Sequence, residues 1–310
     1  MEVGIYSSLW LLVKMQNIHL LGASSLTGSS FNYLYKKKYK IISYSRNNNK
    51  NVFLDLIDYK TFTNINLDLL YNSFIVSYAP IWVTEKFLYF LSTEKKEKLK
   101  KIKGLICCSS SSIITKRFTA NIKDKKLVNV LYNSEQKIYE ICKKLEINCT
   151  IFRPTIIYGE CGKVKDNNLY KLSKIIKQIP FIFLPKNVGL RQPIHSFQMA
   201  KLTSFFINKM SKNNENNFVF EKIDVGGDEI LTYKDMISRL NIKNQKEFIF
   251  KTQILTIPDF LFYIIITPLL IIRPNIFEKI FRISSNYSGF YKYCDLTGEE
   301  IKKFPYKKYL

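Results

Sequence analysis

The sequence predicts an α/β fold, with a doubly wound parallel sheet and a smaller C-terminal lobe. Three observations support this prediction. Short apolar runs alternate with helix-compatible segments, the first run ends at a glycine-containing turn, and the alternation fades after Pro154. A chain of 310 residues is long enough for one large domain or two small ones.

Six short apolar runs have the length of buried strands, at residues 17–21, 40–44, 51–54, 73–78, 105–109 and 148–152. Between them, the spacing predicts a helix over 27–38, a charged helix end that Gly104 would stop, and a long amphipathic helix over 127–145. We divide the chain into an N-terminal extension (1–16), a sheet domain (17–155) and a C-terminal lobe (156–310). A strand near 218–225 is expected to return to the main sheet, so that the lobes interleave.

The N-terminus and the one long apolar segment indicate what kind of membrane contact to expect. Glu2 precedes the apolar run at the N-terminus and no small-residue cleavage site follows, which argues against a secretory signal. We interpret residues 1–14 as an extension or as the result of a start codon upstream of the true one. Thirteen uncharged residues lie between Asp259 and Arg273, interrupted by Pro268. That stretch is short for a span and suits a buried or interfacial helix, so a peripheral membrane contact through 254–272 is expected.

The composition excludes several kinds of site. The net charge of +23 comes mostly from Lys spread among Asn and Ile, and only seven of the 48 basic residues are Arg. No nucleic-acid motif accompanies this charge, so we expect no nucleic-acid partner. The six Cys form no C-x-x-C pair and the two His have no ligand spacing, so no metal site is expected. Unpaired cysteines indicate reduced thiols in a cytoplasmic protein.

The glycine turn predicts a phosphate-binding loop. It consists of Gly22, Ala23, Ser24, Ser25, Leu26, Thr27 and Gly28, placed between a strand and a helix. In such a turn the first glycine permits a tight bend and the last permits close helix–strand packing, while backbone N–H groups approach a pyrophosphate. Ser25 stands where a glycine is usual, which weakens but does not abolish the predicted nucleotide site.

The end of the second strand bears on the choice of nucleotide. A site for NAD usually has an acidic residue there, whereas an Arg accommodates the 2′-phosphate of NADP. This strand ends with Ser45 and Arg46 and has no acid. The sequence therefore favours NADP(H), with NAD(H) as the alternative; Arg46 could also be a solvated loop charge.

In this order, the motifs resemble the extended short-chain dehydrogenase/reductase family of sugar-nucleotide epimerases and dehydratases, which is built on a Rossmann domain. The matching segments are "GASSLTG", the third strand ending at Asp55, "FIVSYAP", "CCSSSS", "TIFRPTIIYG", "GLRQPIHSFQMA" and "IDVGGDEILTYKDM". The resemblance implies that cofactor contacts are made by Asp55, Ala79, Pro80, Ser109, Pro154 and Thr155. It also implies that a nucleotide sugar is held by Asn167, Asn168 and Arg191, the last of these at the diphosphate.

The sequence departs from this family at the catalytic pair. A Tyr-x-x-x-Lys pair on one helix face is expected about two dozen residues before Arg153, yet an ungapped count reaches Leu127 and Leu131. The literal match, Tyr139 with Lys143, lies too near the helix end. The catalytic residues are therefore unknown, and the weak candidates are Ser110, Lys116 and Tyr132.

Two functions remain open at this point. The first is an atypical epimerase, dehydratase or reductase that moves hydride between NADP and a nucleotide sugar with an unusual proton carrier. The second is a catalytically inactive NADP(H)-binding scaffold, assembly or regulatory protein. A homodimer and a cytoplasmic location, with membrane association as an addition, complete the expectations.

Overall fold

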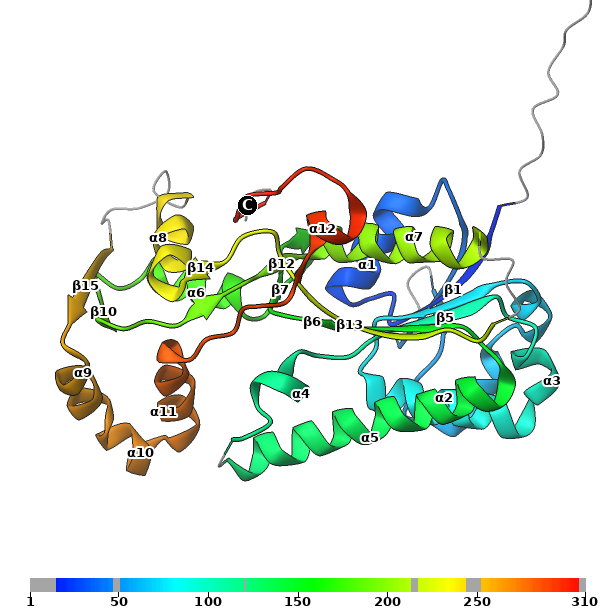
Figure 1. The fold of residues 1–310 in the computed structure, drawn as a ribbon, viewed down its shortest axis with the longest axis horizontal. Coiled ribbons are helices and arrows are strands. Elements are labelled where there is room, and N and C mark those ends of the chain that lie inside the picture. Colours follow the sequence, from blue (N-terminus) through cyan, green and yellow to red (C-terminus); the bar gives the residue numbers. More distant parts are fainter. Residues whose placement is uncertain (1–14, 47–50, 120, 213–216, 244–251, 307–310) are drawn as a thin grey trace, which may run out of the picture.

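The computed structural model describes residues 15–46, 51–119, 121–212, 217–243 and 252–306, and the predicted extension 1–14 lies outside them. At the centre is an eight-stranded, wholly parallel sheet in the order β16-β13-β6-β5-β4-β1-β2-β3 (Figure 1). Its strands, in chain order, are β1 (Asn17–Leu21), β2 (Lys40–Ser45), β3 (Val52–Phe53), β4 (Phe74–Ser77), β5 (Gly104–Cys108), β6 (Cys149–Pro154), β13 (Phe220–Gly226) and β16 (Tyr291–Lys292). The predicted α/β fold with a doubly wound parallel sheet is confirmed.

Helices cover both faces of the sheet because its strands are apolar on both sides. Neighbouring residues of one strand point to opposite faces: Phe74 and Val76 pack into one core cluster, and Ile75 packs into the other. One face is covered by α1 (Leu26–Tyr35), α7 (Ser196–Lys212) and α12 (Tyr293–Thr297), and the other by α2 (Ile81–Glu94), α3 (Lys96–Leu99), α4 (Ser112–Thr115) and α5 (Ile122–Leu145) (Figure 1). Two 3-10 helices, η1 (Tyr59–Asn64) and η2 (Leu67–Leu70), lead from β3 to β4.

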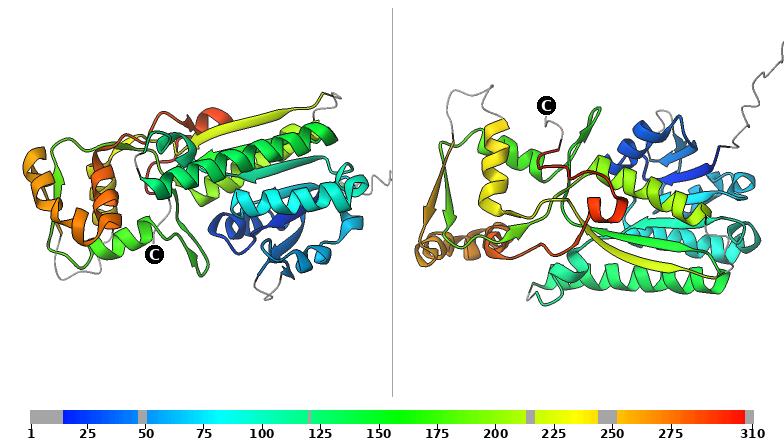
Figure 2. Two further views of the ribbon diagram at one scale, coloured as in Figure 1. Left: turned by 90° about the horizontal axis from the view of Figure 1, so that it is seen from below. Right: turned by 45° about the horizontal axis from the view of Figure 1, so that its top comes forward.

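The second lobe is made of strand pairs and short helices beside the carboxyl end of the sheet (Figures 1 and 2). Its strands are β7 (Ile157–Tyr158), β8 (Glu160–Cys161), β9 (Val164–Lys165), β10 (Phe181–Pro185), β11 (Leu190–Arg191), β12 (Ile194–His195), β14 (Leu231–Thr232) and β15 (Gln253–Ile257). Its helices are α6 (Leu169–Ile176), α8 (Tyr233–Lys243), α9 (Asp259–Ile266), α10 (Pro268–Ile272), α11 (Pro274–Phe281) and η4 (Arg282–Ser284). The chain crosses between lobes more than once, since β13 and β16 lie in the main sheet.

Two local expectations differ from the structure. Gly104 does not stop a helix: it begins β5, where a Cβ atom would meet Met210 Sδ at 2.9 Å and the ring of Phe74 at 3.0 Å. The apolar segment 254–272 is not one helix. Its first part pairs with β10 as strand β15. Pro258 precedes α9, and Pro268 separates α9 from α10, so the rest forms two short helices.

A buried ionic cluster ties α5 to three strand ends. Glu135 on α5 is fully buried, and its carboxylate accepts hydrogen bonds from the Nε (2.9 Å) and Nη2 atoms of Arg153 at the end of β6. Arg153 also contacts Asp224 of β13 at 3.5 Å, and the Ser109 hydroxyl after β5 donates to Glu135 at 2.6 Å. Because a buried carboxylate is stable only when paired, this cluster fixes where α5 crosses the sheet.

We predict that Arg153→Met lowers the free energy of unfolding by about 3–5 kcal/mol, because it leaves the Glu135 carboxylate buried without its main partner. Lys222, whose Nζ is 3.8 Å from that carboxylate, is too distant to replace the lost hydrogen bonds. The measurement is urea denaturation followed by circular dichroism.

The control is the double variant Arg153→Met/Glu135→Leu, which removes both charges and is expected to recover most of the lost stability. An unchanged urea midpoint for Arg153→Met alone would contradict the assignment.

Candidate functional site

Two cavities lie one after the other along the carboxyl edge of the main sheet. The turn cavity, of about 420 Å³, is lined by residues that follow β1, β2 and β4, including Gly22, Ser25 and Ala79. The serine cavity, of about 390 Å³, is lined by residues that follow β5 and β6 and by residues of the second lobe. Because β4 and β5 are neighbours in the sheet, the two cavities occupy consecutive places on the edge where open parallel sheets bind ligands.

Gly22 and Gly28 must be glycines because other backbone atoms lie where a side chain would begin. Gly22 has a φ of +69°, and a Cβ atom there would meet the backbone nitrogen of Ala79 at 2.6 Å. A Cβ atom on Gly28 would collide with the carbonyl oxygen of Gly22 and stand 3.0 Å from the Cα atom of Ala23. Any side chain at these positions would push α1 away from β1 or close the turn cavity.

Ser25 has a structural role that explains why it can replace a glycine. It is the N-cap of α1, and its hydroxyl accepts a hydrogen bond from the backbone N–H of Gly28 at 3.0 Å. Its φ of −68° is open to any residue, so this position has no conformational need for glycine. Ser24 and Ser25 line the turn cavity, whereas Leu26 and Thr27 form the first turn of the helix behind it. The positive end of α1 therefore faces the cavity.

The other residues predicted to contact the cofactor fall into both cavities. The turn cavity brings together Ser45, Arg46, Asp55, Ala79 and Pro80, and the serine cavity contains Ser109, Pro154 and Thr155. Ser45 is buried and accepts from the side-chain amide of Asn51 at 2.9 Å, whereas Arg46 is exposed. The exposed guanidinium of Arg46, directly after β2, lines the turn cavity and can meet an anionic group there.

The serine-rich loop gives the second cavity most of its hydroxyl groups. Ser109, Ser110, Ser111 and Ser112 line it together with Thr115 and Lys116. The hydroxyl proton of Ser109 is committed to Glu135, whereas Ser110 bonds Ser112 within the loop at 3.1 Å. The Thr155 hydroxyl donates to the carbonyl of Gln192, which joins the end of β6 to the second lobe.

The second lobe contributes Asn168, Arg191, Gln192 and Tyr287 to the serine cavity, and Asn167 is exposed next to Asn168. Arg191 is only 4% exposed. Its guanidinium donates to the carbonyls of Leu190 (2.7 Å), Ser285 and Arg282 (2.6 Å). Burial lowers the pKa of Arg191, and the nearby rings of Tyr233 and Tyr287 act in the opposite direction. Arg191 thus both lines the cavity and holds the segment that carries Tyr287.

The helix positions expected for a catalytic pair are apolar and packed. Leu131 is 2% exposed in the core cluster that also holds Ile113 of α4, and Leu127 packs against the same cluster. Tyr132 points away from this core and is 52% exposed. Tyr139 packs against Phe220 at the start of β13, so the literal Tyr-x-x-x-Lys match lies at the opposite end of the strands from the cavities.

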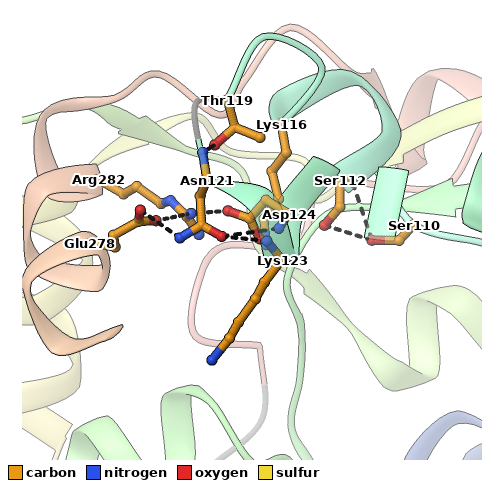
Figure 3. Close-up of polar contacts among 9 residues, drawn as sticks. All are labelled: Ser110, Ser112, Lys116, Thr119, Asn121, Lys123, Asp124, Glu278 and Arg282. Carbon is orange, nitrogen blue, oxygen red and sulfur yellow. Dashed lines mark hydrogen bonds and ion pairs between the residues drawn. The ribbon is translucent and has the colours of Figure 1, made fainter. Parts of the chain in front are cut away.

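Lys116 belongs to an ionic cluster between the lobes (Figure 3). Its ammonium group contacts Asp124 at 2.8 Å, and Asp124 also pairs with Arg282 of the second lobe. Asn121, the N-cap of α5, donates to Glu278 of α11 at 2.6 Å. This cluster borders a third cavity, of about 470 Å³, which shares Thr115, Lys116 and Tyr287 with the serine cavity.

Sequence reasoning missed Gln192 and Tyr287 among the residues that line the serine cavity. Tyr287 is the one with the clearest chemistry. Its backbone N–H bonds the carbonyl of Leu190 at 2.8 Å, and the Arg191 guanidinium carbon lies 4.6 Å from the centre of its ring. It comes from an irregular segment after η4 and belongs to no recognisable motif, so no local signal could have identified it.

The comparisons with known proteins rest on structure, because no protein-family model and no curated protein matches the sequence. UDP-N-acetylglucosamine 4-epimerase from Bacillus cereus is 15% identical with a TM-score of 0.58, over 78% of this chain and 85% of that one. GDP-mannoheptose C4 reductase from Campylobacter jejuni with NADP bound is 12% identical, with a TM-score of 0.58 over 79% and 87%. MoeE5 in complex with UDP-glucose and NAD is 10% identical, with a TM-score of 0.59 over 93% and 94%. The chain therefore has the fold of the extended short-chain dehydrogenase/reductase proteins, as its motifs predicted.

Proposed function

We propose that this protein transfers hydride between NADP(H) and a nucleotide sugar, as an atypical epimerase, dehydratase or reductase. The observation that carries the proposal is the pair of consecutive cavities at the carboxyl edge of the sheet. One has the features of a dinucleotide cradle, and the other is polar and lies between the lobes. Among the structural neighbours, GDP-mannoheptose C4 reductase has NADP bound and MoeE5 is in complex with UDP-glucose and NAD, which supports the same class here.

The turn cavity fits a nicotinamide dinucleotide. Gly22 and Gly28 keep the space beside the start of α1 open, and the N–H groups of its first turn suit a pyrophosphate. Arg46 would meet a 2′-phosphate, and Asp55 lies near the adenine end. Pro154 and Thr155, at the end of β6, would flank the nicotinamide. When bound, the nicotinamide accepts or donates the hydride.

The serine cavity would receive the nucleotide sugar. Within the described residues, three of the five guanidinium N–H groups of Arg191 bind main-chain carbonyls, which leaves two for a substrate diphosphate. Asn168 and the hydroxyls of Ser110 and Ser112 would orient sugar oxygens. Asn167 stays a weaker candidate because it is exposed beside the cavity.

The proton that accompanies the hydride needs a carrier, and Tyr287 is the candidate we favour. Its ring lines the serine cavity with Lys116, and the positive charge of Arg191 lies against it. This charge would stabilise negative charge that develops on the phenol oxygen as the proton leaves. Tyr287 would therefore replace, from the second lobe, the tyrosine that α5 lacks.

A binding protein without turnover is the second candidate. The buried Leu131 and the partly buried Leu127 favour it, because apolar packing at these positions removes the usual proton-transfer pair. All six cysteines are free thiols, which suits a cytoplasmic location under either function.

We predict that Arg46→Ala weakens NADPH binding by about tenfold and leaves NADH binding unchanged, because it removes one charge-assisted contact to the 2′-phosphate. Titration calorimetry with both cofactors measures this. Arg273→Ala, which removes an exposed arginine of the second lobe, is the matched control. Tighter binding of NADH than NADPH by the unchanged protein would reverse the cofactor assignment.

We further predict that Tyr287→Phe lowers kcat by about a hundredfold with little change in NADPH affinity, because it removes a general acid–base group and keeps the ring. The assay follows nicotinamide absorbance with a panel of UDP-, GDP- and dTDP-sugars.

Tyr132→Phe is the matched control, since Tyr132 is exposed outside the cavity. Loss of activity in Tyr132→Phe instead would transfer the role to that residue. If NADPH binds but no nucleotide sugar is converted by the unchanged protein, the scaffold function replaces the enzymatic one.

A further inference from the structure

Helices α9 and α10 lie at the end of the second lobe farthest from β1, β2 and β3 (Figures 1 and 2). They expose a run of apolar side chains. We call it the apolar tip. Its exposed members are Phe260, Leu261, Ile264, Ile265, Leu270, Ile271 and Ile272. Ile271 is 87% exposed and Phe260 is 69% exposed, so these side chains are presented to solvent rather than tucked into the lobe. A contiguous exposed apolar surface of this kind marks an interaction site.

The exposed residues of α9 are not the ones that attach this helix to the lobe. Phe262 and Ile266, one helical turn apart on α9, are 4% and 6% exposed and anchor the helix to the lobe. The outward residues of α9 are apolar as well, so the helix is apolar all round. A helix apolar on every side is normally covered on every side. Within the described chain, the outer face of α9 and α10 has no such cover.

The geometry of the tip suits a surface contact and not a crossing. The thirteen successive uncharged residues 260–272 do not form one helix. Helix α9 ends at Ile266, and α10 begins at Pro268 and has only five residues. No helix among the described residues has the length and apolarity to traverse a bilayer, which takes about 20 residues. Two short apolar helices at an angle can enter only the outer layer of a membrane.

The positive charge around the apolar tip favours a membrane with anionic lipids. Three exposed cations lie close to it in the chain or the fold: Lys186, Arg273 and Lys279. The neighbouring carboxylates are engaged, since Asp259 accepts hydrogen bonds from Asn187 and Glu278 pairs with Arg282. The whole chain carries +23, so a second copy would bring charge of the same sign, whereas anionic headgroups would be attracted.

From these observations we propose that α9 and α10 dock the protein on the surface of an anionic lipid bilayer, with Ile264, Ile271 and Ile272 entering the headgroup–acyl boundary. This contact is separate from hydride transfer, and the proposed function can fail without affecting it.

The test is flotation of the full-length protein with vesicles of phosphatidylcholine alone and of phosphatidylcholine with phosphatidylserine. We expect binding to the anionic vesicles, weaker binding to the neutral ones, and release at high salt. Ile271→Glu/Ile272→Glu should weaken binding to anionic vesicles by about tenfold or more, since each buried isoleucine contributes roughly one decade of partitioning. Both positions are exposed, so folding should be unaffected.

The control is Ile301→Glu, which makes one such replacement at an isoleucine that is 63% exposed elsewhere. It should bind vesicles like the unchanged protein, and the single variant Ile271→Glu, which carries the same added charge, should bind them more weakly. Circular dichroism and NADPH titration check that each variant is folded. The proposal is overturned if the unchanged protein does not float with anionic vesicles, or if Ile271→Glu/Ile272→Glu binds them equally well. It is also overturned if the tip variants abolish self-association in sedimentation velocity while vesicle binding is absent, because the occupant is then a second copy.

Discussion

The buried contact between Glu135 and Arg153 is the interaction on which the site geometry depends. It connects the middle of α5 with the end of β6, and through Asp224 and Ser109 it reaches β13 and the loop after β5. Two of these segments, the loop after β5 and the end of β6, line the serine cavity. A carboxylate with no exposed surface tolerates little displacement from its cation, since each lost hydrogen bond leaves charge in a low-dielectric interior. The position of the serine-rich loop is thus set by charge pairing beneath it.

The same contact shows how the fold holds α5 in place while the positions before Glu135 are apolar. Glu135 holds α5 against the sheet, and Leu131, one turn earlier, is packed in the core beside Ile113. Nothing about the fold requires a polar group at that turn. The polar residues that line the serine cavity come from the segments after β5 and β6 and from the second lobe, and none comes from α5.

The sequence predicted the sheet well because that prediction uses local information. Apolar runs of strand length, Gly22 and Gly28 at a strand–helix turn, and Arg46 at a strand end are all visible within a few residues. What it could not predict are contacts between distant segments. Tyr287 is an example: it lies at the cavity because it contacts Leu190 and Arg191, almost a hundred residues earlier in the chain. The segment 254–272 was misjudged for a related reason: β15 forms only because β10 offers it an edge, and hydrophobicity alone does not distinguish a strand from a helix there.

The third cavity shares residues with the serine cavity and borders α11, the helix that follows the apolar tip in the chain. It lies between the loop after α4 and helix α11, with Phe118, Phe277 and Phe281 on its apolar side and Lys116 on its polar side. Helix α11 is joined to α10 through Pro274, and the ionic cluster of Asn121, Asp124, Glu278 and Arg282 fixes it against the start of α5 (Figure 3). Only α11 therefore separates the apolar tip, in the chain, from the third cavity, which shares Tyr287 with the serine cavity. Helix α11 is therefore connected to α10 at one end and to α5 through the ionic cluster at the other. Docking of α9 and α10 would hold the third cavity in a fixed orientation to the membrane, and the turn cavity would remain beside the main sheet.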